Sequence, residues 1–385
     1  MTIRPKLPRI AALSAAMLMA SALVIGGSST SSATPPEATL RKAAPIDLKI
    51  GSATWGQRDL TPYTTKHPTA YQSLLAAQFS SVTPENDMKW DAIHPAPAVY
   101  DFTSADAVVA FAKSNGMSVR GHTLLWHSQN PQWVTDAAQT WTCDEARSVL
   151  KDHILTVVGH FRGKIYEWDV ANEIFHDTWD EGGVRLRTDQ NPFLKACAAD
   201  PVGLIGDAFR WAHQADPKAA LFMNDYAAEG INAKTDAYYA LAKQLLAEGV
   251  PLGGFGAQAH LDLDYAFDTS LQANFQRFAA LGLKVAVTEA DVRVRVDSSD
   301  QPLDPADVQR QADQYGQLLK ACLNVKACSS FTVWQDTDAY SWVPGVFPGK
   351  GYATPWTADL QAKPAATTMR SLLEDATPGR SPRRS

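Results

Sequence analysis

The strongest constraint on the fold is an alternation of short apolar runs, rich in β-branched and aromatic residues, with longer segments of helical pattern. The runs cover residues 48–52, 80–82, 118–120, 165–168, 220–223, 254–257, 284–287 and 330–333. In one intervening segment, Tyr238, Ala242 and Leu245 share a helical face that ends before Gly249. No Gly-rich phosphate loop follows the first run. The pattern therefore favours an α/β fold of the (β/α)8 TIM barrel type, as a single domain, over an open doubly wound sheet.

The N-terminus has the layout of a secretory signal peptide. Arg4, Lys6 and Arg9 precede an apolar run over residues 10–25, which Gly26 and a serine-rich stretch end. A membrane anchor is the alternative, but the run is short for a bilayer span. We predict a secreted, extracellular protein with a removed signal peptide (1–33), a polar linker (34–46), one barrel domain (47–374) and a polar C-terminal tail (375–385).

Net charge limits the class of partner. The chain has a formal charge of −6, and loss of the three basic residues of the leader would make it −9. An acidic protein of this kind is a poor match for nucleic acid or for an anionic membrane. Its charge is compatible with a neutral polymer.

The four cysteines all follow the leader, and an even number in an exported chain is consistent with two disulfides. Cys322 and Cys328 are close in sequence and are expected to pair, which leaves Cys143 with Cys197. Free buried thiols are the alternative. The cysteine and histidine spacings do not fit a zinc site, and we expect no metal.

Polar residues cluster directly after the apolar runs, where a TIM barrel builds its active site. Glu173 follows the fourth run and Glu289 the seventh, so the two carboxyl groups can face each other across the barrel mouth. One protonated and one ionised carboxyl group are what hydrolysis of a glycosidic bond requires. A surface ion pair would explain a lone glutamate, but not two at complementary strand ends.

The motifs PENDMKW, GHTLLWHSQ, WDVANE, NDY, QAH, VTEAD and VWQDTDAYSWVPG, in this order over residues 48–373, resemble those of glycoside hydrolase family 10. NDY and QAH are weak signals alone, whereas WDVANE followed by VTEAD is specific. The resemblance implies a retaining endo-1,4-β-xylanase that cleaves internal bonds of xylan through a covalent glycosyl-enzyme, with Glu173 as acid/base and Glu289 as nucleophile. It implies xylan or xylo-oligosaccharides as substrate and no cofactor, and we expect a monomer.

The resemblance also assigns supporting roles. The residues implied to bind the two sugars on the non-reducing side are Glu85, Asn86, Lys89, His122, Trp126 and Gln258. Asn172 is implied to bond the hydroxyl at carbon 2, while His260 and Asp291 keep Glu289 ionised and oriented. His127 either tunes the acid/base or only supports the site. Further expected features are substrate contacts from Asn224, Tyr226, Trp334 and Trp342, and a cis peptide bond at His122–Thr123.

Three features depart from the family's pattern or lie outside it. Ala227 and Ala228 follow NDY, where asparagine is usual, which removes a hydrogen bond on the leaving-group side. Gln335 follows Trp334, where glycine is common, and either points away from the cleft or narrows it. Residues 176–191 form part of the leaving-group side or an ordinary surface loop.

Substrate preference is the most open part of the functional prediction. Xylose lacks the hydroxymethyl group of glucose, and a cleft crowded by Lys89, Gln258 and Trp342 would favour the pentose. The alternatives are a related β-1,4-glucanase or mixed xylanase/cellulase, and an inactive carbohydrate-binding barrel. The presence of both carboxylates argues against an inactive barrel.

Overall fold

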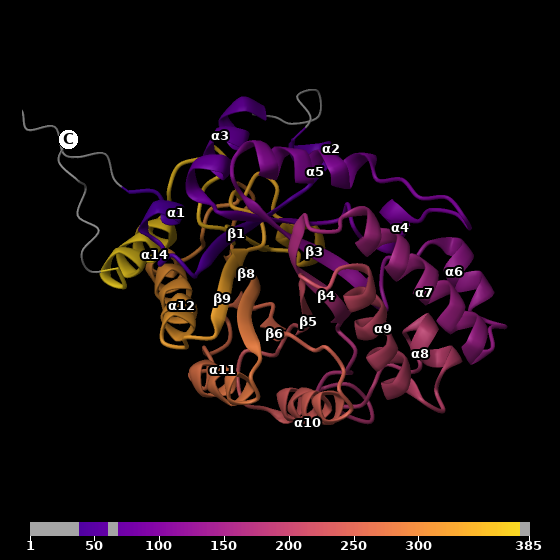
Figure 1. Ribbon diagram of the computed structural model, residues 1–385. Coiled ribbons are helices and arrows are strands. Elements are labelled where there is room, and N and C mark those ends of the chain that lie inside the picture. The colour runs from indigo at the N-terminus through magenta and orange to yellow at the C-terminus, as the bar shows by residue number, and fades with distance from the viewer. Residues whose placement is uncertain (1–37, 61–67, 378–385) are drawn as a thin grey trace, which may run out of the picture. The chain divides into compact units, whose positions relative to one another are not determined.

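The computed structural model describes residues 38–60 and 68–377, and it contains a barrel of parallel strands surrounded by helices (Figure 1). The barrel strands are β1 (Lys49–Thr54), β2 (Ser81–Pro84), β3 (Ser118–Leu125), β4 (Ile165–Asn172), β5 (Ala220–Asp225), β6 (Gly254–Ala257), β8 (Lys284–Arg295) and β9 (Cys328–Val333). Neighbours in this order pair in parallel, and β9 pairs with β1, which closes the barrel. The predicted (β/α)8 TIM barrel is confirmed.

All eight predicted runs fall on barrel strands, but three strands continue well beyond them. β3 runs to Leu125, β4 to Asn172 and β8 to Arg295, so the predicted ends of these strands are wrong. The prediction ended these strands at Arg120, Trp168 and Val287, before the polar residues of the site, whereas pairing with the neighbouring strands continues beyond those points. Beyond the barrel, β8 pairs with the short strands β7 (His260–Asp262) and β10 (Lys350–Gly351).

Helices cover the outside of the barrel (Figure 1). They are α1 (Leu40–Ala43), α2 (Gly56–Asp59), α3 (Pro68–Gln78), α4 (Trp90–Ile93), α5 (Thr103–Ser114), α6 (Gln132–Ala137), α7 (Cys143–His160), α8 (Pro192–Ala196), α9 (Pro201–Ala215), α10 (Ala233–Ala247), α11 (Leu271–Ala280), α12 (Ala306–Leu323), α13 (Val343–Val346) and α14 (Pro364–Asp375). In α10, the Asn232 side chain caps the first turn by accepting from the Thr235 amide at 3.0 Å. Tyr238, Ala242 and Leu245 are buried, which confirms the predicted apolar face.

The domain begins earlier than the sequence indicates. Leu40, Ala43 and Ala44 are buried, and the Arg41 guanidinium donates to the Ala76 carbonyl oxygen at 2.8 Å. The described part of the predicted linker over 34–46 is therefore packed structure, because its apolar residues dock beside α3 and α14. The predicted signal peptide (1–33) lies outside the described residues, as does most of the predicted tail.

Both predicted disulfides are present. Cys143 is bonded to Cys197, 54 residues away, and Cys322 is bonded to Cys328, six residues away. The first joins the start of α7 to the end of α8, and the second joins the end of α12 to the start of β9. Free buried thiols, the alternative for these four residues, are ruled out in this structure.

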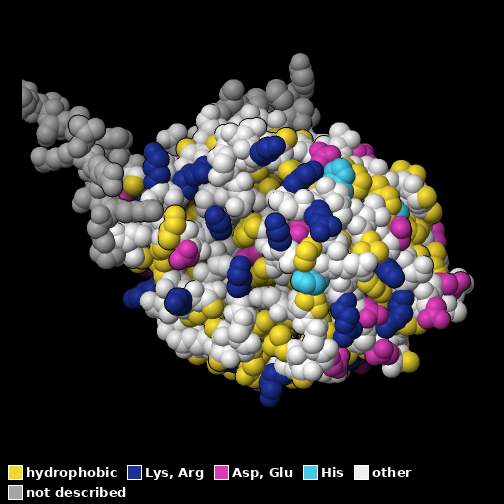
Figure 2. Space-filling model, viewed as in Figure 1, with side chains coloured by type: hydrophobic (Ala, Val, Ile, Leu, Met, Phe, Trp, Pro, Cys, Tyr) yellow, Lys and Arg dark blue, Asp and Glu magenta, His cyan; other side chains and the backbone are white. Residues whose placement is uncertain are grey.

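The surface mixes both signs of charge. Figure 2 shows Lys and Arg side chains interspersed with Asp and Glu on the viewed face, with apolar side chains between them. Some form partly exposed ion pairs, such as Arg147 with Asp207 at 2.7 Å. Exposed pairs of this kind contribute little to stability. Within the described ranges, no helix is both long enough and apolar enough to cross a bilayer.

Inside the barrel, by contrast, three charged side chains are fully buried together. Arg120 on β3 donates to Glu167 at 2.6 Å and to Asp169 at 2.5 and 3.2 Å, both on β4. Their side chains are no more than 1% exposed. Burial alone would raise the pKa of Asp169, but Arg120 and His122 outweigh it and lower that pKa. The cluster therefore keeps a carboxylate ionised in the interior.

Arg120→Met should destabilise the fold by about 3–5 kcal/mol, because it leaves Glu167 and Asp169 buried without their counter-ion. Urea unfolding measures this loss. The control is Arg147→Met, which breaks a partly exposed pair and should cost less than about 1 kcal/mol. Equal losses for the two variants would contradict the interpretation.

Candidate active site

The carboxyl ends of the barrel strands surround a cleft of about 640 Å³ that contains both predicted carboxyl groups. The predicted site residues that line it are Lys89, His122, Trp126, Glu173, Tyr226, Gln258, His260, Glu289, Trp334 and Trp342. Asn172, Asn224 and Asp291 are fully buried and contact the carboxyl groups or His260. The structure thus brings together residues from β3, β4, β5, β6, β8 and β9.

Glu173 directly follows β4 and is fixed by donors on both carboxylate oxygens. Trp126 Nε1 donates to Oε2 at 2.8 Å, and Gln258 Nε2 donates to Oε1 at 3.0 Å. Its backbone N–H donates to the Asn224 carbonyl at 2.9 Å, which ties the end of β4 to β5. His127 Nδ1 lies 3.8 Å from Oε2, so both predicted roles of His127 remain compatible with its position.

Glu289 lies on β8 and faces a different set of groups. Asn224 donates to its Oε1 at 2.8 Å, and His260 Nε2 lies 3.2 Å from its Oε2. His122 Nδ1 is 3.9 Å from Oε1. Burial would raise the pKa of Glu289, but His122 and His260 outweigh it and lower that pKa. Glu289 is therefore ionised near neutral pH.

The charge that keeps Glu289 ionised comes in part from His260. Burial would lower the pKa of His260, but Asp291 at 2.9 Å and Glu289 outweigh it and raise the pKa to about 10. His260 is thus protonated and donates through both ring nitrogens. Trp342 Nε1 donates to the same Asp291 oxygen at 2.7 Å, which fixes the chain behind Glu289. The predicted polar chain of His260 and Asp291 is present.

A second group of polar residues lies next to the pair. Lys89 Nζ donates to Asn86 at 3.0 Å and to Gln129 at 2.7 Å, and it sits 4.9 Å from the centre of the Trp126 ring. Burial lowers the pKa of Lys89, against the opposing effect of Glu85. Asn172 contacts the Asn224 side chain at 2.9 Å and lies beside Glu173. The expected cis peptide bond at His122–Thr123 is also present.

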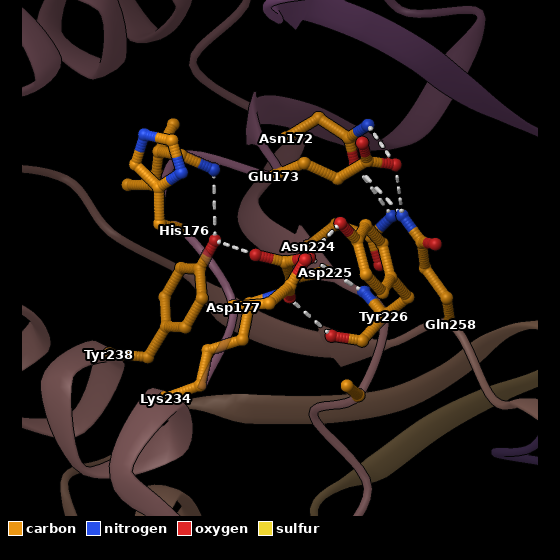
Figure 3. A network of polar contacts seen from close by, with 12 residues as sticks. Asn172, Glu173, His176, Asp177, Asn224, Asp225, Tyr226, Lys234, Tyr238 and Gln258 are labelled. Carbon is orange, nitrogen blue, oxygen red and sulfur yellow. Dashed lines mark hydrogen bonds and ion pairs between the residues drawn. The ribbon is translucent and has the colours of Figure 1, made fainter. Parts of the chain in front are cut away.

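The segment 176–191 is anchored by a buried ion network, shown in Figure 3. Lys234 Nζ donates to Asp177 at 2.7 Å and to Asp225 at 2.8 Å. Tyr238 donates to Asp225 at 2.7 Å and accepts from the Ile174 backbone N–H at 3.1 Å, one residue after Glu173. Burial, partly offset by Lys234, raises the pKa of Asp225 to about 7. The segment is therefore held in place by the groups that surround the end of β4.

Two exposed aromatic residues also line the cleft. Trp179, in the segment 176–191, is 68% exposed, and Tyr265, after β7, is 73% exposed. Of the two departures near them, Ala227 lines the cleft and Ala228 is buried. Of the two alternatives for residues 176–191, a contribution to the cleft or an ordinary surface loop, the position of Trp179 supports the first.

Several residues of the site were not predicted from the sequence. They are Gln129, Trp179, Glu229 and Tyr265, all of which line the cleft. Gln129 lay within the quoted motif GHTLLWHSQ, and Glu229 lies just after NDY, so order and spacing could have found both. Exposed aromatic residues in loops carry no periodic signal. No cluster of three or more potential metal ligands occurs in the described part of the chain.

His260→Asn should raise the pKa of Glu289, because it removes a cation in contact with that carboxylate. Glu289 would then become protonated at a higher pH, as carbon-13 NMR titration of its carboxyl group can measure. His160→Asn removes a comparable histidine–aspartate contact at the surface, 2.9 Å from Asp106, and is the control. An unchanged Glu289 titration in His260→Asn would refute the electrostatic role of His260.

The comparisons with known proteins agree with this geometry. The model of Glycosyl hydrolase family 10 matches residues 40–372. An endo-1,4-beta-xylanase of Agaricus bisporus is 37% identical over 320 residues, covering 83% of this chain and 91% of that protein. The crystal structure of native xylanase 10B from Thermotoga maritima is 38% identical with a TM-score of 0.79, covering 88% of this chain and 98% of that one.

A related structure carries a sugar. Xylanase 10B from Thermotoga petrophila RKU-1, in complex with xylobiose, is 37% identical to this chain with a TM-score of 0.79. The match covers 89% of this chain and 99% of that one. With a family model that spans nearly all described residues, the chain belongs to glycosyl hydrolase family 10.

Proposed function

We propose that the protein is an endo-1,4-β-xylanase that hydrolyses internal bonds of xylan with retention of configuration. The observation that carries the proposal is the pair of carboxyl groups in one cleft, each with its own set of partners. Glu289 faces a histidinium, whereas Glu173 receives neutral donors from Trp126 and Gln258. Such different surroundings are what two carboxyl groups with opposite proton-transfer roles require.

In the proposed mechanism, Glu289 attacks the anomeric carbon while Glu173 gives its proton to the leaving oxygen. The glycosidic bond breaks, and the sugar is held as an ester of Glu289. Glu173, now ionised, takes a proton from water, whose oxygen attacks the same carbon and releases Glu289. Two inversions give net retention. Asn172 lies beside Glu173 and would bond the hydroxyl at carbon 2 during both steps.

On the non-reducing side, the proposed substrate contacts are Glu85, Asn86, Lys89, His122, Trp126 and Gln258. Several of these side chains are already hydrogen-bonded within the site: Lys89 donates to Asn86, and Trp126 and Gln258 both donate to Glu173. The site is therefore ordered before sugar binds. Trp334 and Trp342 line the same cleft and offer faces for sugar rings. A rigid, crowded site supports selection of the smaller pentose.

We place three aromatic rings of the cleft on the leaving-group side, and two of them, Trp179 and Tyr265, are exposed. Tyr226, Trp179 and Tyr265 line the cleft, and Ala227 stands where the family commonly has asparagine. Stacking on an aromatic ring tolerates different orientations of the sugar, whereas a hydrogen bond requires one donor–acceptor geometry. This arrangement supports binding of a long chain that continues beyond the cleavage point, as endo action requires.

We further propose that the protein is secreted and acts as a monomer. The two disulfides favour an oxidising compartment. The cleft and its carboxyl groups are complete within one chain, so catalysis needs no residue from a second copy.

An assay on soluble xylan and on carboxymethylcellulose tests the substrate. The rate on xylan should exceed that on the glucan by about tenfold or more, because the crowded glycone site has to reject one hydroxymethyl group per sugar. A rate on carboxymethylcellulose equal to or above that on xylan would instead support the glucanase alternative.

A 2-fluoro-xylobioside with a good leaving group should become covalently attached to Glu289. Fluorine at carbon 2 destabilises both transition states, while the activated leaving group restores only the first step, so the ester accumulates. Mass spectrometry of a proteolytic digest would locate the label.

The control for labelling is Glu173→Ala, which removes the acid but keeps Glu289. It should still be labelled, because an activated leaving group needs no proton. Label on a residue other than Glu289, or a wild-type protein that turns over the reagent without labelling, would exclude the proposed retaining mechanism.

A further inference from the structure

Gln335 occupies a backbone position that suits glycine. It follows Trp334 at the end of β9, its φ is 72°, and its side chain is fully buried. A left-handed backbone costs a non-glycine residue free energy, on the order of 1–3 kcal/mol where it persists. The strain is retained here because the side chain makes contacts that glycine could not make.

Those contacts fix the Gln335 amide at both ends. Its Nε2 donates to Glu85 Oε2 and to Asp59 Oδ2, the latter at 3.1 Å. Its Oε1 accepts from the Tyr71 hydroxyl at 3.2 Å. Of the two orientations left open by the sequence, Gln335 therefore points away from the cleft and does not narrow it.

The partner that matters most is Glu85, which is 5% exposed. Arg58 Nη2 lies 3.1 Å from the same carboxylate oxygen, Oε2, that Gln335 contacts. No described residue donates a hydrogen bond to Oε1 of Glu85. Two donors on one oxygen fix the rotation of the carboxylate and leave the other oxygen as the acceptor for a ligand.

We propose that Gln335 is a positioning residue that sets the carboxylate of Glu85 for the second sugar on the non-reducing side. The inference rests on the proposed glycone-binding role of Glu85. Among the described residues, the side-chain hydrogen bonds of Glu85 run to Gln335 and Arg58 and not to the catalytic pair, whereas Gln258 and His260 contact the pair directly. Loss of the Gln335 amide thus affects recognition of the outer sugar and leaves the reacting sugar unaffected.

Charged groups face Glu85, so the pH dependence of activity is a second readout of its environment. They are Arg58 and Asp59 from α2 and Lys89 from the turn after β2. Burial raises the pKa of Glu85, while Arg58 and the Gln335 amide oppose that rise. Without the amide, Glu85 would become protonated at a higher pH and would stop accepting from a sugar hydroxyl there.

The test compares an aryl β-xylobioside, which fills both glycone positions, with an aryl β-xyloside, which fills one. Gln335→Gly keeps the backbone conformation without strain. It should lower kcat/KM on the xylobioside about tenfold, mainly through KM, and leave the xyloside unchanged. The acid limb of the xylobioside profile should move to higher pH.

Two further variants separate positioning from folding. Gln335→Met keeps the volume and the strained backbone but removes the amide, and it should match Gln335→Gly. Asp300→Gly relieves another left-handed residue, φ 57°, on an exposed loop and should leave both substrates unaffected. Thermal unfolding of every variant checks that each is folded.

The inference is overturned if the Gln335 variants retain the wild-type ratio of the two substrates, or if they lose activity on both equally. The wild-type protein tests the proposed function separately. If its kcat/KM gains nothing from the second xylose, the glycone role of Glu85 fails, whatever the Gln335 variants do.

Discussion

The structure depends on a line of buried ionisable side chains that runs from the barrel interior to the cleft. Arg120 neutralises Glu167 and Asp169 in the core, and Asp169 then holds the His122 ring at 3.1 Å. His122 in turn lies beside Glu289. Because Arg120, Glu167 and Asp169 are all buried, removing one of them would leave its partner in the interior without a counter-charge. The buried groups that stabilise the barrel are therefore the same groups that hold His122 beside Glu289 in the cleft.

The sequence predicted the barrel and the pair of carboxyl groups because both have regular signals. Apolar runs recur at strand spacing, and polar residues such as Glu173 and Glu289 follow them directly. The extents of β3, β4 and β8 were wrong, since strand pairing in the closed barrel continues through polar residues. The direction of Gln335 and the exposure of Trp179 depend on tertiary contacts, and no local pattern encodes these.

Under the proposed function, the two sides of the cleft would recognise sugars by different physical means. The glycone side uses buried polar groups that bond to one another, as Lys89 does to Gln129, so a ligand with one extra or missing group leaves a buried partner unsatisfied. The leaving-group side uses exposed rings such as Trp179 and Tyr265, which accept many orientations. Specificity should accordingly reside on the non-reducing side, and tolerance of chain length and branching on the other.

Backbone strain is concentrated around the same cleft. Five non-glycine residues there have left-handed backbone: Gln129, Glu173, Ala227, Ala259 and Gln335. Each is held by a specific bond: Gln129 by Lys89, Glu173 by the Asn224 carbonyl, Ala227 by Asn232, Ala259 by Glu229 and Gln335 by Glu85. Strained residues persist only where their surroundings over-determine them. The hydrogen bonds that orient the cleft residues thus also hold the strand ends in left-handed conformations that are otherwise unfavourable. The site is rigid because these strand ends are fixed.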